Sequence, residues 1–213
     1  MTTRLRVLLS VLCVTAAVTA AYWLWPATAG LAPSEALRRV PGPVYVVRVE
    51  PVANESVDAF VQAITPWLPW EVQLVADVTV DERHELSWEG DLYDVDHLLD
   101  RLAEKMPRAA LVVGLTDQAM HDEQHWWLYG KGGQVAIVST AHLWAEYDVP
   151  GQADPLFRER LAKVGVHELG HNLGFQHCDD SQCVMKFSTE LYMLDATRPI
   201  FCRACMKAWL SWH

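Results

Sequence analysis

The stretch VHELGHNLGFQHC, residues 166–178, decides how the second half of this chain is arranged. Residues four apart lie on the same face of an α-helix, so His167 and His171 can hold one ion together. Glu168 lies beside them, where it can polarise a water on that ion rather than bind the ion itself. The stretch therefore predicts a helix that carries a metal site with a carboxylate next to it.

A glycine allows a third histidine to join this pair. A helix that continued past His171 would carry residue 177 away from the ion. Gly174 can adopt a positive φ and end the helix, after which the chain doubles back and brings His177 to the ion. Zinc suits imidazole ligands and in catalytic sites takes three ligands from the protein, which leaves a position for water. We therefore predict a catalytic zinc on these three histidines.

Upstream of this helix, short β-branched runs alternate with amphipathic segments. The runs predict strands at residues 43–50, 71–80, 109–115 and 134–139, the last of them after a turn at 130–133. Helices are expected at 54–64 with Asn54 as the cap, from Asp94 onward, and at 155–173 with Asp154 as the cap. A Cys-rich loop and a short helix near 203–210 follow. The alternation predicts an α/β (α+β) domain with helices packed on one sheet.

Length and charge limit the classes of function. The chain has 213 residues, which suits one folded domain, expected here to cover residues 44–213. Its formal net charge is -10, whereas a protein that binds nucleic acid needs clustered lysine and arginine. Nucleic acid is therefore not an expected partner.

Residues 1–29 form a separate segment. Arg4 and Arg6 precede the uncharged residues 7–25, which as a helix would span about 28 Å, roughly the core of a bilayer. Because arginines favour the cytoplasmic side, the segment predicts a signal anchor with the following domain outside the cytoplasm. The alternative is a cleaved signal peptide and a secreted protein, since small residues before Gly30 fit a cleavage site. Residues 30–43 contain several prolines and are expected to form a linker.

Four of the five cysteines form two closely spaced pairs, Cys178 with Cys183 and Cys202 with Cys205. If the pairs converge, they suit a closed tetrahedral four-cysteine zinc site that staples the loop after the histidines to the C-terminal segment. Because the N-terminal segment predicts export and exported thiols tend to oxidise, the alternative is two disulfides, or one disulfide with a redox-active CxxC. Cys13 lies in the apolar segment and is interpreted as a small apolar residue.

Together these residues resemble the archaemetzincin family of metalloproteases. The resemblance rests on HExxHxxGxxHC at 167–178, on Cys183-Val-Met185 and on Cys202-x-x-Cys205, so it covers mainly residues 164–205. It implies a compact metzincin-like zincin domain with a mixed, twisted sheet and helices packed on it. It also implies a zinc-dependent hydrolase that cleaves peptides or proteins, and aminopeptidase-like activity is described for family members.

The same resemblance implies a role for each site residue. The catalytic zinc would be held by three histidines: His167, His171 and His177. A second, structural zinc would be held by four cysteines: Cys178, Cys183, Cys202 and Cys205. Glu168 would be the general base, and Met185 would be the methionine of the turn beneath the catalytic zinc. By analogy, the strand at 134–139 would be the edge strand on which an extended substrate lies.

Two other functions fit the sequence. One is an exported, non-catalytic zinc or thiol redox or binding module, in which the last cysteine pair exchanges disulfides. The other is a membrane-tethered interaction protein that uses its tryptophans: Trp67, Trp70, Trp88, Trp126, Trp127 and Trp144. Tyr192 is the one candidate for stabilising the transition state and is otherwise a packing residue. The remaining histidines have no ligand spacing and are expected to be surface or packing residues: His84, His97, His121, His125, His142 and His213.

Overall fold

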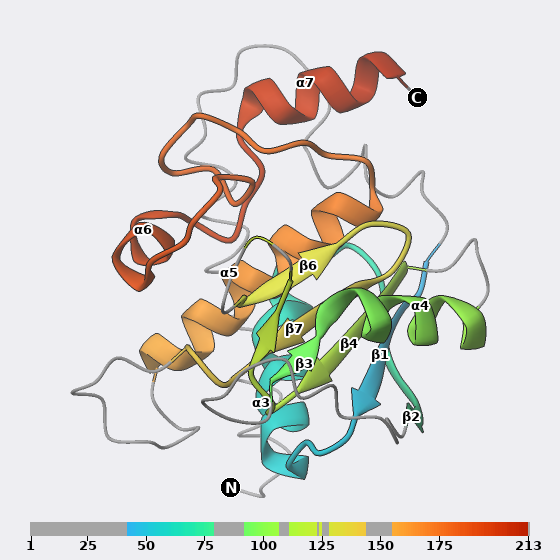
Figure 1. Ribbon diagram of the computed structural model, residues 1–213. Helices are drawn as coiled ribbons and strands as arrows, with labels where there is room; N and C mark the ends of the chain where they lie inside the picture. Colours follow the sequence, from blue (N-terminus) through green and yellow to red (C-terminus); the bar gives the residue numbers. More distant parts are fainter. Residues whose placement is uncertain are drawn as a thin grey trace, which may run out of the picture.

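The computed structural model describes residues 42–78, 92–106, 111–122, 124, 128–143 and 155–212 (Figure 1). Its elements are, in chain order, β1 (Val44–Val49), α3 (Asn54–Ile64), the 3-10 turn η1 (Thr65–Trp67), β2 (Val72–Val78), β3 (Tyr93–Asp94), α4 (Val95–Lys105), β4 (Leu111–Thr116), β5 (Met120–His121), β6 (Gly130–Gly132), β7 (Ala136–Ser139), α5 (Pro155–Asn172), α6 (Leu191–Ala196) and α7 (Arg203–Trp212). The predicted N-terminal anchor or signal peptide, nearly all of the linker and the Asp154 cap lie outside these residues. Among the described residues, every helix is either too short or too polar to span a bilayer.

One five-stranded sheet, in the order β2-β1-β4-β7-β6, forms the centre of the domain. Its first four strands are parallel and β6 runs antiparallel to β7, so the prediction of a mixed sheet is confirmed. β4 and β7 are buried along their whole length, as parallel strands are when helices cover both faces of a sheet. β3 and β5 form a separate two-stranded pair that the sequence did not predict.

Helices cover both faces of the sheet, as Figure 1 shows. α3 and α5 pack on one face, where their buried side chains, including Phe60 and Leu161, join the larger hydrophobic core. α4 packs on the opposite face, where Leu98 and Leu102 meet strand residues such as Ile137. Burying these apolar faces is the main favourable contribution to folding. It also holds α5, the helix with the histidines, against the sheet.

Two of the predicted helix caps lie in described residues, and the structure confirms only one of them. Asp94 caps α4 as predicted, because its carboxylate accepts hydrogen bonds from the backbone amides of Asp96 and His97. Asn54, in contrast, is not the cap of α3. The cap position is Ala53, whose amide donates to the carboxylate of Asp117 at the end of β4 (2.7 Å). The sequence could not indicate this donor–acceptor pair, because its members are 64 residues apart.

The prediction that residues 134–139 form an edge strand is wrong. β7 occupies that range but lies between β4 and β6 in the interior of the sheet. The edge is β6, which pairs with β7 through Gly130–Val138, Lys131–Ile137 and Gly132–Ala136. Most of the segment predicted as a turn, residues 130–133, is therefore a strand. Among the described residues, no strand pairs with the side of β6 that faces away from β7, and β6 lies beside α5 (Figure 1).

The segment that follows α5, residues 173–212, packs against the C-terminal end of that helix (Figure 1). Gly174 has a φ of +87° and ends the helix, as predicted, with the Phe175 amide donating back to the Gly170 carbonyl (3.0 Å). Trp209 of α7 donates its indole N–H to the Leu173 carbonyl (2.7 Å), which satisfies a carbonyl left unpaired at the helix end. The Phe175 ring stacks on Phe201 at a centroid separation of 4.3 Å. These contacts fix the chain reversal that follows α5.

Candidate active site

Three histidine side chains converge at the C-terminal end of α5. His167 and His171 lie one turn apart on the helix, and their Nε2 atoms are 3.1 Å apart. The reversal at Gly174 brings the ring of His177 to centroid distances of 5.4 Å from His167 and 4.9 Å from His171. One ligand atom from each ring lies within 4.8 Å of the others. Tetrahedral nitrogen ligands about 2.0–2.1 Å from a zinc ion would lie about 3.3 Å apart, so the cluster fits one such ion.

Two of these rings are oriented by backbone carbonyls. Nδ1 of His167 donates to the carbonyl of Val184 (2.6 Å), and Nδ1 of His171 donates to the carbonyl of Phe175 (2.9 Å). With the proton on Nδ1, the lone pair is on Nε2 and directed into the cluster. Burial lowers the pKa of His167 to about 4 and lowers the pKa of the other two rings. The imidazoles are therefore neutral near pH 7, which is the form that binds metal.

Glu168 lies beside the cluster and is almost inaccessible to solvent, with 6% of its surface exposed. Burial raises the pKa of its carboxyl to about 8. A carboxyl group with a pKa near neutral can both accept and release a proton under physiological conditions, which is what a general acid–base residue requires. The carboxylate lies against the backbone of β6, where its oxygens approach Gly130 and Gly132.

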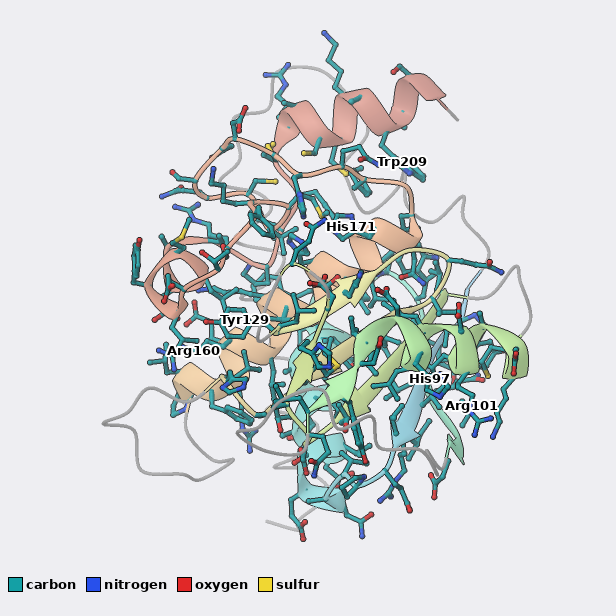
Figure 2. All side chains as sticks on the ribbon, in the orientation of Figure 1. His97, Arg101, Tyr129, Arg160, His171 and Trp209 are labelled. Carbon is teal, nitrogen blue, oxygen red and sulfur yellow. The ribbon has the colours of Figure 1, made fainter. Side chains whose placement is uncertain are left out.

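A cleft of about 480 Å³ opens onto these groups. β6 and the preceding Tyr129 form one wall, and residues 186–190 with Leu194 form the other. Burial, and then the negative charge of Glu190, raise the pKa of Tyr129 to about 12, so its phenol stays protonated. The cleft is thus bounded by a strand edge on one side and a loop on the other. Tyr129 and His171, both labelled in Figure 2, are among the residues that line the cleft.

Met185 lies beneath the turn of α5 that carries the histidines. It is completely buried, and a methyl group added at Gly170 would come within 2.5 Å of its sulfur. The Met185 carbonyl accepts a hydrogen bond from the amide of Cys178 (2.8 Å). Met185 therefore packs directly against the helix that carries two of the histidines, and its role in a turn beneath a metal stays a prediction. Tyr192, in contrast, is 73% exposed and does not line the cleft, so neither role suggested for it is supported.

The two predicted cysteine pairs also converge. Sγ of Cys178 is 3.7 Å from that of Cys202, and Sγ of Cys183 is 3.8 Å from that of Cys205. Tetrahedral thiolates about 2.3 Å from a zinc ion would lie about 3.8 Å apart, whereas disulfide sulfurs are bonded at about 2.0 Å. The spacing therefore fits a zinc site with four cysteine ligands. No further metal-binding cluster occurs among the described residues, so the described histidines outside the triad remain without a ligand role: His97, His121 and His142.

The two clusters are joined through very short pieces of chain. His177 and Cys178 are consecutive, and the Val184 carbonyl that orients His167 directly follows Cys183. The Val184 amide donates to the carbonyl of Ile200 (2.9 Å), close to Cys202. Any displacement of the cysteine cluster must therefore move two of the groups that set the geometry of the histidine cluster.

A partly buried ion pair fastens the far wall of the cleft to α5. Arg160, labelled in Figure 2, makes two hydrogen bonds of 2.9 Å to the carboxylate of Asp195 in α6 and a third to the Leu143 carbonyl. Lys163, which is fully buried, donates to the Asp195 carbonyl (3.0 Å) and pairs with Glu159 (2.8 Å). These contacts hold α6, and with it the cleft residue Leu194, at a fixed distance from α5.

The sequence pattern identified the groups of both clusters but missed the walls of the cleft. Tyr129, β6 and the Arg160–Asp195 pair carried no recognised motif. Gly130 and Gly132 are two residues apart and would therefore lie on the same face of a strand. This spacing is the one local signal for a strand that has no side chains on one face. The predicted tryptophan surface is only partly described: Trp67 and Trp70 are half-buried against the core, and the other four lie outside the described residues.

Comparison with known sequences relates most of this chain to one family. The model of Peptidase family M54 matches residues 78–209. The archaemetzincin of Methanopyrus kandleri is 33% identical over 161 residues, which cover 74% of this chain and 87% of that protein. The archaemetzincin of Natronomonas pharaonis is 28% identical over 123 residues, which cover 55% of this chain and 70% of that protein.

Solved structures give the same relation. The crystal structure of the Methanopyrus kandleri archaemetzincin superposes with a TM-score of 0.62 at 29% identity and covers 79% of this chain and 93% of that one. A zinc-dependent peptidase from Methanocorpusculum labreanum superposes with a TM-score of 0.65 at 20% identity, over 79% of this chain and 100% of that one, and this likeness concerns the fold alone.

Replacing Asp195 with alanine tests the ion pair that holds α6. Asp195 has 32% of its side chain exposed and Arg160 only 4%, so the variant leaves a nearly buried guanidinium without its carboxylate. We expect a loss of about 2–4 kcal/mol in the free energy of unfolding, somewhat below the range for fully buried pairs. Urea unfolding measures it. The exposed Asp58→Ala variant on α3 should stay within about 0.5 kcal/mol of the parent, and an equal effect of the two substitutions would contradict the role of the pair.

Proposed function

The chain belongs to peptidase family M54, the archaemetzincins, which makes it a zinc metallopeptidase, and we propose that it hydrolyses peptide bonds at the histidine cluster of α5. The observation that carries the proposal is the convergence of three neutral imidazoles beside a buried carboxylate, at the floor of a cleft. Three protein ligands leave one position of a tetrahedral zinc ion open, which is the arrangement of catalytic rather than structural sites.

The ligands of the catalytic zinc are, in this proposal, the Nε2 atoms of His167, His171 and His177. Zinc in this position supplies Lewis-acid chemistry, because it polarises a carbonyl oxygen and makes water more acidic. The carbonyls of Val184 and Phe175 keep two of the rings in the orientation that binding requires. The chain thus pre-organises the ligand set before any substrate arrives.

Glu168 carries out the proton transfers. Its carboxylate accepts a proton from the attacking water and then donates it to the nitrogen of the leaving amine. Its burial supports this role in two ways: the raised pKa keeps both protonation states accessible, and exclusion of solvent strengthens its electrostatic effect on the reacting atoms.

The substrate lies in extended form along β6. Among the described residues, β6 is the antiparallel edge of the sheet, and it forms a wall of the cleft, so its outer backbone groups can pair with a peptide by β-addition. Both aminopeptidase-like and internal cleavage are compatible with the cleft. Matched peptides with free and acetylated N-termini separate the two modes, because an aminopeptidase requires the free amine.

A second zinc on the four cysteines would complete the enzyme, giving two zinc ions per chain. The sulfur spacings support this arrangement, and burial raises the pKa of Cys183 to about 12, so a cation is needed to keep its thiolate. The ion would staple the loop after α5 to the start of α7. Its function is structural, since four protein ligands leave no position for water.

Replacing Glu168 with alanine separates chemistry from metal binding. The variant should keep its zinc content, measured by metal analysis, because the carboxylate is not a ligand. Its kcat on a peptide library should fall by at least about 10²–10⁴-fold, the contribution typical of a positioned general base. The Glu104→Ala variant, on the exposed side of α4, should cleave like the parent. Peptidase activity that survives Glu168→Ala would rule out the proposed mechanism.

We also propose that residues 1–29 anchor the domain on the outer side of a membrane. The support is the uncharged stretch 7–25 behind two arginines. The full chain with a C-terminal tag should sediment with membranes, keep its first residues, and expose its domain to protease added outside. A tagged protein that lacks the first 29 residues would indicate a cleaved signal peptide instead, and a tag protected in the cytoplasm would contradict export.

A further inference from the structure

Two glycines of β6, Gly130 and Gly132, pack directly against α5, because neither has a side chain that would separate the strand from the helix. A methyl group built at Gly130 would come within 2.7 Å of Cγ and 2.9 Å of Oε1 of Glu168. One built at Gly132 would come within 2.6 Å of the Glu168 carbonyl, 2.7 Å of Cβ of His171 and 3.0 Å of Oε2 of Glu168. Carbon atoms do not normally approach so closely, so any residue other than glycine must displace one of these groups.

The two glycines meet different parts of Glu168. The space that a side chain at Gly130 would need is occupied by the side chain of Glu168. The carbonyl oxygen of Ile137 in the neighbouring strand is also there, 2.8 Å from the position of the added methyl group. The space at Gly132 is filled first by the backbone of α5. Gly132 therefore allows strand and helix to approach each other, whereas Gly130 leaves the slot in which the carboxylate itself lies.

From this contrast we propose that Gly130 is a positioning residue for the general base. Its missing side chain creates a slot between β6 and α5 that holds the Glu168 carboxylate at one place beside the histidine cluster and against the edge strand. Gly132 sets the distance between strand and helix, with Lys131 between them held by Asp96 (2.8 Å) and Asp122 (3.2 Å). The inference rests on the proposed function of Glu168, but the contact itself is independent of catalysis.

The chain offers a matched control on the same segment. Gly133 directly follows β6, and a methyl group built there would meet nothing closer than the Val135 carbonyl at 4.0 Å. It does not line the cleft. Gly133→Ala therefore changes the same residue type at nearly the same place without filling the slot.

A double-mutant cycle on the full, zinc-loaded chain tests the proposal without relying on activity. Gly130→Ala should lower the Tm by about 4–8 °C, the effect expected when one methyl group overfills a packed site in a protein of this size. In the Glu168→Ala background the same substitution should lower the Tm by half as much or less, because the slot is empty. Gly132→Ala should lower the Tm equally in both backgrounds, and Gly133→Ala should leave it unchanged.

Kinetics of the single variant give the second readout. Gly130→Ala should lower kcat at least tenfold with KM within twofold and an unchanged zinc content, while Gly133→Ala should cleave like the parent. Equal Tm losses from Gly130→Ala in both backgrounds, or a kcat within twofold of the parent, would overturn the proposal. If Gly130→Ala fails to fold alone, a folded Gly130→Ala/Glu168→Ala variant supports the slot, and failure of both overturns it. Activity retained by Glu168→Ala would instead reject the proposed function and leave the Tm cycle valid.

Discussion

The way α5 ends fixes the position of everything that follows it. At Gly174 the positive φ reverses the chain, and three hydrogen bonds close the end: from the Gly174 amide to the His171 carbonyl, from Phe175 to Gly170, and from the Trp209 indole to Leu173. An L-residue with a side chain adopts this φ only at a cost, which is why glycine occupies the position. The reversal places His177 beside the histidines of α5 and places the next residue, Cys178, in the cysteine cluster.

The two clusters therefore form one mechanical unit. Three consecutive residues link the clusters. Cys183 belongs to the cysteine cluster, the Val184 carbonyl orients His167, and Met185 packs against α5. On the other side of α5, the glycines of β6 bring the strand edge against Glu168. The helix that carries the histidine cluster is thus held on one side by a buried methionine and on the other by a strand. In the proposed mechanism, its groups therefore need little reorganisation.

The sequence predicted the parts of this unit that depend on local spacing. Helical periodicity places His167 and His171 on one face, and the Asp94 cap and the four β-branched strands follow from short-range preferences. The parts that failed depend on contacts between distant residues. Asp117 accepts the amide of Ala53, the N-cap residue of α3, from 64 residues away. The place of residues 134–139 in the sheet depends on pairing with β6, whose glycine-rich sequence resembles a turn. Arg160 and Asp195 form an ion pair although they are 35 residues apart, and no sequence motif predicts this pair.

We propose that the chain binds one zinc ion on three histidines and one on four cysteines. Anomalous diffraction at the zinc absorption edge, on crystals of the purified chain, tests it most directly. We expect two peaks, one among the Nε2 atoms of His167, His171 and His177 and one at about equal distances from the four cysteine sulfurs. No peak at the histidines, or sulfurs bonded in pairs at about 2.0 Å, would contradict it.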